Sequence, residues 1–421
     1  MGLSKWALTG WVDLARTVSK CRADRLRDPT GHAVSESGPD SVPSQGEIWI
    51  LCRSLRILCR SLIGGGTEKA CVILASELQA NPWKIRLATL FGDPADDAFL
   101  LPPDVERFSA TYDVGTTVTG KISRYFWAAR QLRLEAKASQ PQVVLAMGWP
   151  AAVVALLALS GTAIPVIVSE RSDPRELQPI WPWRALRRTM YRSAEYLVVQ
   201  TDQIAEQANR WIPSERIKII ENLVSPEAFQ QIHEENQSER IVTVGRLVPE
   251  KGHDSLLRAL QIVHRTFPNA TLDLVGDGPE CGRLSELART LQLESSIRFH
   301  GFVKDPKTIT LLCSIFVLPS KTEGFPNALL EAMASGMPCV ATDCRSGGPA
   351  RLVTSGTNGR IVPINEVNQM AEAITELLAD PALRVSYGIA ARERAAQNRP
   401  EFIIPLWNNL ILEAINHRGS L

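Results

Sequence analysis

The feature that most constrains the fold is an alternation, from about residue 47 onward, of short apolar runs with amphipathic segments. The amphipathic segments, among them Ser255–Phe267, Leu284–Leu291 and Asn327–Ser335, have the spacing of helices with one buried face. The apolar runs are rich in Val, Ile and Leu and are bounded by Gly, Pro or Asp, which is typical of buried strands. They include Val143–Met147, Pro165–Ser169, Tyr196–Gln200, Arg240–Val244, Thr271–Val275, Ile315–Leu318 and Cys339–Thr342. Such repetition predicts an α/β fold with parallel sheets covered on both faces.

These units are too numerous for one sheet, and a polar segment at Gln230–Arg240 is typical of an interdomain linker. We therefore expect two doubly wound domains, at 47–228 and 238–400, that face a central cleft. We expect residues 1–46 to be a poorly ordered extension and 401–421 to form a C-terminal helix that packs back on the first domain. Ligands of such sheets bind at the carboxyl ends of the strands, so the cleft is the expected site.

Composition excludes several functional classes. The chain has 46 Lys and Arg against 45 Asp and Glu, so no overall positive field favours nucleic acid. Its eight cysteines form no CxxC pair and its six histidines show no ligand spacing, which favours buried thiols in a reducing compartment and no metal site. With no apolar stretch long enough to cross a bilayer, we expect a cytoplasmic protein, peripheral on the inner face of the plasma membrane if it contacts lipid.

The strongest local signal is "SKTEGFPNALLEAMASGMPCVATD", which starts at Ser320. A strand precedes it, a loop follows, and Pro326 stands where a helix would begin, a position that suits proline because the missing N–H would have no partner there. The backbone amides from Gly324 to Leu329 would then face the cleft at the positive end of the helix dipole. This arrangement predicts an anion site suited to phosphate.

Two carboxylates, Glu323 and Glu331, flank and enter this predicted helix. A carboxylate close to a phosphate site accepts hydrogen bonds from hydroxyl groups and does not bind the phosphate itself. We therefore expect one of the two carboxylates to bind a ribose diol and the other to bind a sugar hydroxyl. The alternative is a surface helix with two solvated glutamates, which the glycine and proline context disfavours.

Three further loops carry glycine or positive charge after predicted strands. In "VTVGRLVPEKG" a strand ends at Gly245, and Arg246 and Lys251 could clamp a diphosphate or form a solvated pair of loop charges. The turn "LVGDGPE" supplies Gly276 and Gly278, whose backbone a nucleotide base could approach, although G-D-G also marks plain turns. The run 64–66 with "TE" opens a helix in the first domain and could face the same diphosphate.

Together these residues resemble the retaining glycosyltransferases of the large family 4, which have the two-domain GT-B fold. The resemblance covers about residues 47–400 and is carried by "VGRLVPEKG", "LVGDGPE", "IRFHGFVKD", "EGFPNALLEAMASGMPCVATD" and "NGRIV" in the second half. The first half matches more loosely through "GGTEKACVILASEL", "VSERSDP" and "VVQTD".

This resemblance implies that the second domain binds a nucleotide diphosphate sugar, commonly a UDP- or GDP-sugar, without a metal or other cofactor. It implies that Arg246 and Lys251 hold the diphosphate. It further implies that Glu331 binds the ribose and Glu323 contacts the transferred sugar. We therefore expect catalytic roles for Glu323, Arg246 and Lys251. The expected donor contacts are Gly65, Gly66, Gly245, Gly276, Gly278, Gly324, Phe325, Pro326, Asn327, Ala328, Leu329 and Glu331.

On the acceptor side the pattern departs from the family. Many relatives carry a histidine in the first domain's cleft, where this chain has Gly148–Trp149–Pro150, so no catalytic role is carried over to that position. The segment "ERSDP" places Glu170, Arg171 and Asp173 at the end of a strand. These residues are candidates for acceptor binding, and a capped turn is the alternative.

A tandem duplication precedes the glycine run: 50–56 reads ILCRSLR and 57–63 reads ILCRSLI. We expect Glu47–Cys52 to form the first strand and the second copy to be displaced toward the loop, because a shift of seven would swap the faces of a continuous strand. The duplicated segment either is accommodated without effect on activity or weakens activity.

The segment 180–192, "IWPWRALRRTMYR", interleaves tryptophan with arginine. It predicts a basic helix face suited to peripheral contact with anionic headgroups or a lipid diphosphate. The alternative is a packed helix with solvated cations.

The expected function is transfer of a sugar to a glycan or polyprenyl-linked acceptor in the synthesis of surface polysaccharide or glycoconjugate. The alternatives are an impaired sugar-nucleotide-binding protein and, less favoured, a sugar-nucleotide epimerase.

Overall fold

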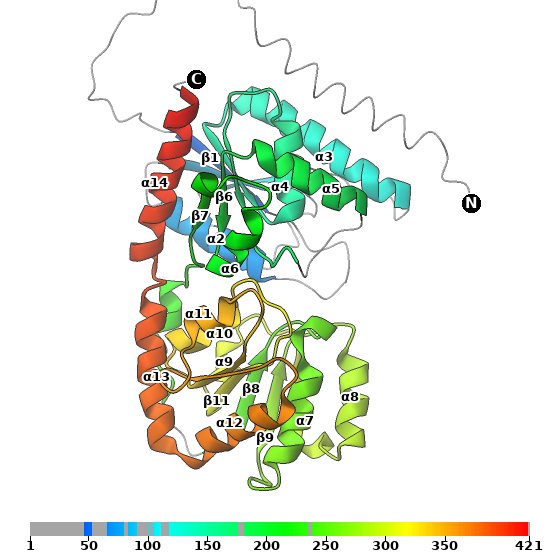
Figure 1. Ribbon diagram of the computed structural model, residues 1–421, viewed down its shortest axis with the longest axis vertical. Coiled ribbons are helices and arrows are strands. Elements are labelled where there is room, and N and C mark those ends of the chain that lie inside the picture. Colours follow the sequence, from blue (N-terminus) through cyan, green and yellow to red (C-terminus); the bar gives the residue numbers. More distant parts are fainter. Residues whose placement is uncertain are drawn as a thin grey trace, which may run out of the picture.

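The computed structural model describes residues 46–52, 65–79, 83–90, 101, 103, 105–110, 118–175, 181–234 and 238–419. Figure 1 shows two lobes stacked along the long axis, with the C-terminal helices running along one side of both. The predicted extension, apart from Gly46, and the second copy of the repeated phrase lie outside the described residues.

The first lobe is built on a parallel seven-stranded sheet of order β3-β2-β1-β4-β5-β6-β7. Its strands are β1 Gly46–Cys52, β2 Trp83–Thr89, β3 Glu106–Ser109, β4 Val143–Met147, β5 Val166–Ser169, β6 Tyr196–Val199 and β7 Ile217–Ile219. Its helices are α2 Gly66–Gln79, α3 Val118–Ser139, α4 Trp149–Ala158, α5 Trp181–Met190 and α6 Asp202–Ala208. The predicted first strand is confirmed, and β1 lies between β2 and β4.

The second lobe is built on a parallel six-stranded sheet of order β10-β9-β8-β11-β12-β13. Its strands are β8 Arg240–Val244, β9 Thr271–Val275, β10 Ile297–Gly301, β11 Ile315–Leu318, β12 Cys339–Thr342 and β13 Arg360–Val362. Its helices are α7 His253–Val263, α8 Cys281–Thr290, α9 Lys307–Thr310, α10 Asn327–Ala334, α11 Gly348–Leu352, α12 Val367–Ala379 and α13 Pro381–Ala396. The prediction of two doubly wound α/β domains is confirmed.

The core explains why the apolar runs identified the strands. β4, β5, β6, β11 and β12 are buried along their whole length, as strands must be when helices cover both faces of a sheet. No helix in the described part of the chain combines the length and apolarity needed to cross a membrane.

The last helix, α14 (Pro400–Gly419), returns to the first lobe after α13 has packed on the second. Ile403, Trp407 and Ile411 are buried in one apolar cluster with side chains of α2 and β4. In addition, Trp83 Nε1 donates a hydrogen bond to Asn408 Oδ1 at 3.2 Å. The C-terminal segment thus ties the two lobes together on the side shown in Figure 1.

A half-buried carboxylate fixes the crossing between the lobes. Glu221, after β7, accepts hydrogen bonds from Arg351 Nε at 2.5 Å and from Arg394 Nη2 and Asn398 Nδ2, each at 2.9 Å. Burial alone would raise the pKa of Glu221, but Arg394, Arg351 and Asn398 hold it below its ordinary value. The crossing is therefore held by groups from both lobes, since Arg351 belongs to α11.

Candidate active site

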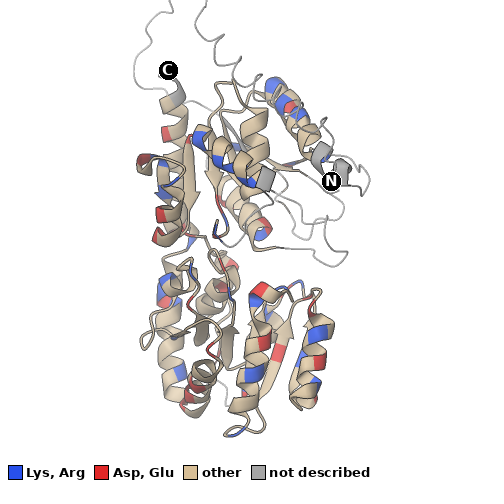
Figure 2. Ribbon diagram, turned by 45° about the vertical axis from the view of Figure 1, so that its right-hand side comes forward, with Lys and Arg blue, Asp and Glu red and all other residues tan. Residues whose placement is uncertain are grey.

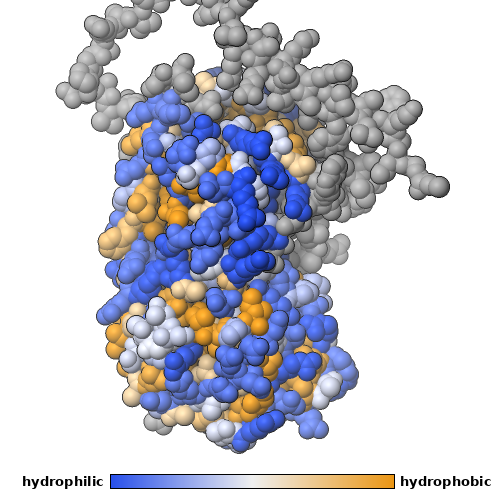
Figure 3. Space-filling model, in the orientation of Figure 1, coloured by the Kyte–Doolittle hydropathy of each residue, from blue (hydrophilic) through white to orange (hydrophobic). Residues whose placement is uncertain are grey.

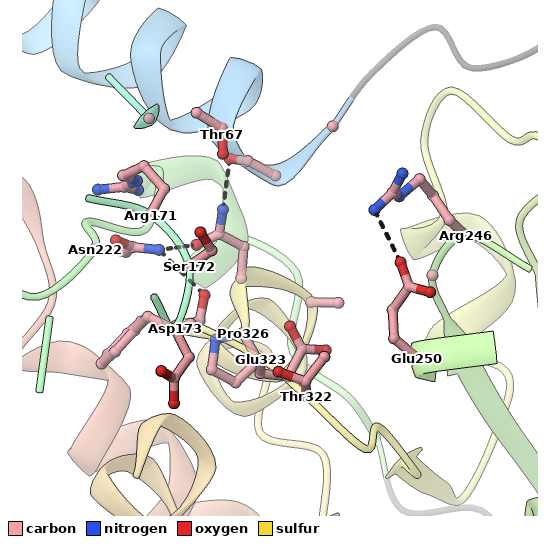
Figure 4. A pocket seen from close by; sticks show the side chains of 18 of the residues that line it. Thr67, Arg171, Ser172, Asp173, Asn222, Arg246, Glu250, Thr322, Glu323 and Pro326 are labelled. Atoms are coloured by element: carbon pink, nitrogen blue, oxygen red, sulfur yellow. Dashed lines mark hydrogen bonds and ion pairs between the residues drawn. The ribbon is translucent and has the colours of Figure 1, made fainter. Parts of the chain in front are cut away.

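A cavity of about 520 Å³ lies between the two lobes. Topology places it there, because the strand order reverses between β1 and β4 in the first sheet and between β8 and β11 in the second. Described residues that follow all four strands line it, at 65–68, 147–150, 244–246 with 250–251, and 318 with 322–328. In Figure 4, Arg171, Ser172 and Asn222 lie on one side of Glu323, and Arg246 with Glu250 lies on the other.

The start of α10 forms one wall of the cavity. Gly324, Phe325, Pro326, Asn327 and Ala328 line it, and no side chain caps the helix. Pro326 is the N-cap, with φ −79° and ψ 101°, so the helix begins one residue later than the sequence predicts. The reason is that this ψ is still extended, and the chain turns into the helix only at Asn327. Free backbone amides at a helix N-terminus attract anions.

The two predicted cations lie on the loop after β8, with Gly245 beside them in the cavity lining. Lys251 Nζ lies 2.6 Å from Glu323 Oε1, and Ser320 Oγ donates to the same oxygen at 2.6 Å. Arg246 is more exposed, with Nη2 3.7 Å from Glu250 Oε1. Lys251 and Arg246 therefore both border the cavity, and Lys251 orients the Glu323 carboxylate.

Gly276 and Gly278 lie behind the β8 loop and do not line the cavity. A Cβ on Gly276 would lie 1.9 Å from Gly245 O, and one on Gly278 would lie 2.3 Å from Leu247 O. Lack of a side chain thus allows two loops to pack closely. The backbone of their own lobe fills the space beside these glycines, and approach of a nucleotide base to their backbone stays a prediction.

Leu329 and Glu331 also lie outside the cavity lining. Leu329 is fully buried in the apolar core of the second lobe, so only its backbone could serve a donor. Glu331 Oε1 lies 2.6 Å from Lys69 Nζ of α2, which joins the two lobes through an ion pair. Sequence reasoning did not anticipate Lys69, because nothing local relates the two helices.

Asparagines bridge the lobes next to the cavity. Asn222 Nδ2 donates to Asn327 Oδ1 at 2.6 Å and to Phe325 O at 3.3 Å. Asn327 Nδ2 in turn donates to Gly66 O at 2.8 Å, which Figure 4 shows beside Thr67. Gly65 and Gly66, predicted to approach the donor, therefore line the cavity and are held against the start of α10.

The "ERSDP" segment lies at the cavity, but its first residue faces the other way. Arg171 and Asp173 line the cavity, whereas Glu170 is 1% exposed and points into the first lobe. Arg187 Nη2 and Tyr191 Oη both donate to Glu170 Oε2, at 2.7 and 2.8 Å. The expected acceptor contact by Glu170 is therefore wrong in this geometry, because a buried ion pair holds the carboxylate.

Arg187 was predicted to belong to a basic surface on 180–192, and it does not. The side chain is 3% exposed, and its guanidinium lies over the rings of Tyr191 and Trp211. Burial alone would lower the pKa of Arg187, and Glu170 more than offsets this. Burial also raises the pKa of Tyr191, which keeps the phenol a hydrogen-bond donor. The exposed arginines of this segment are Arg184, Arg188 and Arg192.

Asp173 is also buried, and its carboxylate binds the Arg175 side chain through Nε at 2.9 Å and Nη2 at 2.6 Å. Arg175 Nη2 also donates to Arg345 O of the second lobe at 2.7 Å. Asp173 thus lines the cavity while orienting a cross-lobe contact. The alternative of a capped turn describes part of its role, since Asp173 Oδ1 accepts the Arg175 backbone N–H.

Comparison with known families matches almost all of this two-lobed region. The family described as glycosyl transferases group 1 matches residues 224–394, and the glycosyl transferase 4-like domain matches 65–222. The chain belongs to the group 1 glycosyltransferases.

Curated relatives match parts of the chain. The glycosyltransferase is 33% identical over 224 residues to an exopolysaccharide phosphotransferase of Streptomyces coelicolor, covering 52% of this chain and 24% of that one. It is 34% identical over 167 residues to a GDP-mannose-dependent alpha-(1-6)-phosphatidylinositol monomannoside mannosyltransferase of Mycolicibacterium smegmatis, covering 38% and 43%. The chain thus spans less than two thirds of these curated relatives.

The fold is shared with solved glycosyltransferases. Sucrose-phosphate synthase from Thermosynechococcus elongatus superposes with a TM-score of 0.77 at 19% identity, covering 88% of this chain and 100% of that one. Anabaena HepE in complex with UDP-glucose gives a TM-score of 0.70 at 20% identity, covering 89% and 100%. The GT-B fold implied by the resemblance is confirmed.

Several residues of the glycosyltransferase site escaped sequence reasoning. Ser172, Asn222 and Thr322 all line the cavity, as does Trp149, whose position was expected in the cleft but was given no role. Asn222 had a local signal, because it follows the strand "IKII" just before the interlobe connection. For the others, only the meeting of the two lobes shows their role.

The buried pair allows a prediction on stability. In Arg187→Met, the Glu170 carboxylate loses its buried cation, and we expect the free energy of unfolding of the first lobe to fall by about 3–5 kcal/mol. The measurement is urea denaturation followed by tryptophan fluorescence. Arg188→Met, on the exposed side of the same helix, is the matched control, with an expected change within about 0.5 kcal/mol. Equal effects of the two substitutions would contradict the assignment, and adding Glu170→Gln to Arg187→Met should recover stability.

Proposed function

We propose that this glycosyltransferase moves a hexose or N-acetylhexosamine from a UDP- or GDP-sugar to a glycan or lipid-linked acceptor, with retention of configuration. The observation that carries the proposal is the convergence, in one cavity, of Arg246, Lys251 and the uncapped start of α10 with the carboxylate of Glu323. Positive groups that surround an acid suit a sugar diphosphate, which presents anionic oxygens and hydroxyls together.

The fixed positive groups supply the chemistry that the reaction requires. As the bond from the sugar to the diphosphate breaks, negative charge collects on the leaving oxygen, and preorganised donors stabilise that charge in the transition state. Arg246, Lys251 and the α10 amides are such donors, and we therefore propose transfer without a metal ion. Glu323, held by Lys251 and Ser320, would accept hydrogen bonds from the transferred sugar.

Retention is proposed to follow from attack on the face that the diphosphate leaves. In this scheme the acceptor hydroxyl forms the new glycosidic bond as the old one breaks, and its proton goes to the departing phosphate oxygen. No enzyme carboxylate forms a covalent intermediate. The Arg171–Asp173 wall of the cavity, in the first lobe, would be the acceptor side.

Named relatives support the donor and acceptor classes. HepE binds UDP-glucose, and the Mycolicibacterium enzyme is named for GDP-mannose and a phosphatidylinositol monomannoside acceptor. The alternative of an impaired sugar-nucleotide-binding protein depends on the 50–63 duplication, of which 53–63 lie outside the described residues, and no observation favours it. It predicts nucleotide binding without turnover.

The test is a screen of UDP- and GDP-sugars by thermal shift, followed by a transfer assay with the best binder. We expect Glu331→Gln to weaken binding of the matching nucleotide about 10- to 100-fold, because the proposed charge-assisted hydrogen bond to the ribose, for which Glu331 would exchange its partner Lys69, is lost. Glu372→Gln, at an exposed position on α12, is the matched control. Absence of any nucleotide-dependent shift in the wild-type protein would refute the proposal.

A further inference from the structure

We propose that an anionic membrane docks on the outer faces of α3 and α5 and that its lipid-linked acceptor reaches the cavity along an aromatic track of Trp149, Trp183 and Tyr125. The inference rests on the proposed function and specifies its acceptor as a lipid held in a bilayer. Its support comes from a set of ring contacts that begins in the cavity and ends at the partly exposed Tyr125 of α3, and from the exposed aromatic and basic side chains of α3 and α5.

The inner end of the track is Trp149, the first residue of α4. It lines the cavity beside Gly148, whose φ of 81° turns the chain sharply from β4 into the helix. Its ring lies 6.3 Å from that of Trp183, with an interplanar angle of 58°. This distance is within the range of favourable aromatic pairs, so apolar surface continues from the cavity onto α5.

The track then passes from α5 to α3. The Trp183 ring lies 4.8 Å from the Tyr125 ring, which brings the two helices into contact above α4. Both residues are partly exposed. A chain of apolar groups can therefore follow these rings without displacing the core.

A group of large exposed side chains lies on the outer face of α3, on the other side of the helix from Tyr125. Phe126, Trp127 and Leu134 are 39%, 43% and 48% exposed. Trp127 and Leu134 are seven residues apart and share one helix face. The Arg130 guanidinium lies 5.3 Å from the centre of the Trp127 ring, a pairing typical of side chains at a lipid headgroup layer.

Exposed positive charge lies on the neighbouring helix α5 and directly after it. Arg184, Arg188 and Arg192 are exposed, and Arg184 and Arg188 are one turn apart on α5. The helix α5 contains no acidic residue, and Glu135, the one acid of α3, forms an ion pair with Arg86. Figure 2 shows Lys and Arg gathered on these two helices. Exposed aromatic groups beside cations that no acid of α5 opposes match an anionic bilayer surface.

Vesicle flotation tests the docking surface. We expect the full chain to bind vesicles of 70% phosphatidylcholine and 30% phosphatidylglycerol and to bind pure phosphatidylcholine much more weakly. The combined substitution Arg184→Gln, Arg188→Gln, Arg192→Gln should lower the vesicle affinity on the order of 100-fold, since each basic residue contributes about a factor of five. Arg258→Gln, Arg265→Gln, Arg289→Gln, exposed positions of the second lobe, is the matched control. An equal loss of vesicle affinity in the two triple variants, or no loss in either, would contradict the proposed docking surface.

Farnesyl diphosphate, a soluble isoprenoid diphosphate, tests the track by calorimetry. We expect Trp183→Ala to weaken its binding about tenfold and Trp183→Phe to retain most of it, because one ring replaces another. UDP binding should be unchanged in both variants, which separates a lost track from a misfolded lobe. Unchanged affinity for farnesyl diphosphate in Trp183→Ala would contradict the proposal that the acceptor lipid follows the aromatic track. Vesicle binding without sugar transfer by the wild-type protein would refute the proposed function alone.

Discussion

Lys251→Met is expected to lower kcat about 10²- to 10³-fold, the loss typical of removing one preorganised donor from a site of developing charge. Lys251 Nζ lies 2.6 Å from Glu323 Oε1, and its side chain is 20% exposed. The substitution removes a cation from the proposed leaving group and also releases the carboxylate that faces the sugar. Both effects act on the transition state, so kcat should fall more than nucleotide affinity.

Lys321→Met is the matched control for this prediction. Lys321 lies on the neighbouring loop, pairs with Asp254 at 3.2 Å and does not line the cavity.

Glu323→Gln should also lose turnover. The double variant Lys251→Met, Glu323→Gln should lose less than the product of the single losses, because the two groups act as a unit. Transfer rates measured at saturating donor decide the matter. Near-normal kcat in Lys251→Met would remove the central argument for the proposed chemistry.

Gly324→Ala is expected to reduce kcat on the order of 10²-fold while UDP or GDP affinity stays within about threefold. A Cβ at Gly324 would lie 2.4 Å from Arg171 O of the first lobe. The loop has no space for retreat, since a Cβ on Gly348 would already lie 2.2 Å from Gly324 O on its other side. The lobes must therefore move apart, and a displacement of about 1 Å between reacting groups can cost 10²-fold in rate.

Gly282→Ala is the control for the same change. Gly282 lies in α8, and its Cβ would meet nothing within 4 Å. This variant should retain full activity and be as stable as the wild type or slightly more stable, because alanine favours a helix. Small-angle scattering of Gly324→Ala should show a more open pair of lobes. A fully active Gly324→Ala variant would show that close approach of the lobes at Arg171 is not required.

Much of the fold was accessible without coordinates. The strands β4, β8, β9, β11 and β12 have the predicted bounds, because strands covered by helices on both faces are rich in Val, Ile and Leu. The loops after β8 and β11 were also correctly located, since glycine, proline and charge mark the points where a strand ends. Local chemistry sets these features, and local chemistry can be read from neighbouring residues.

Side-chain direction and partner could not be read in this way. Glu170 and Asp173 are three residues apart in one motif, yet the first binds Arg187 inside the lobe and the second lines the cavity. Likewise, Arg187 and Arg188 are adjacent, and one is buried while the other is exposed. Which of them faces solvent depends on how α5 packs on the sheet.

The sequence by itself determined the two parallel sheets, the order of their elements and the loops that carry charge and glycine. Only the tertiary structure decided how the lobes meet: Asn327 binds the carbonyl of Gly66 across 261 residues of sequence, and Lys69 reaches Glu331. The physical reason is that strand and helix formation follows from periodic burial within short segments. Contacts between lobes depend instead on the relative placement of rigid bodies, to which no short segment contributes a recognisable pattern.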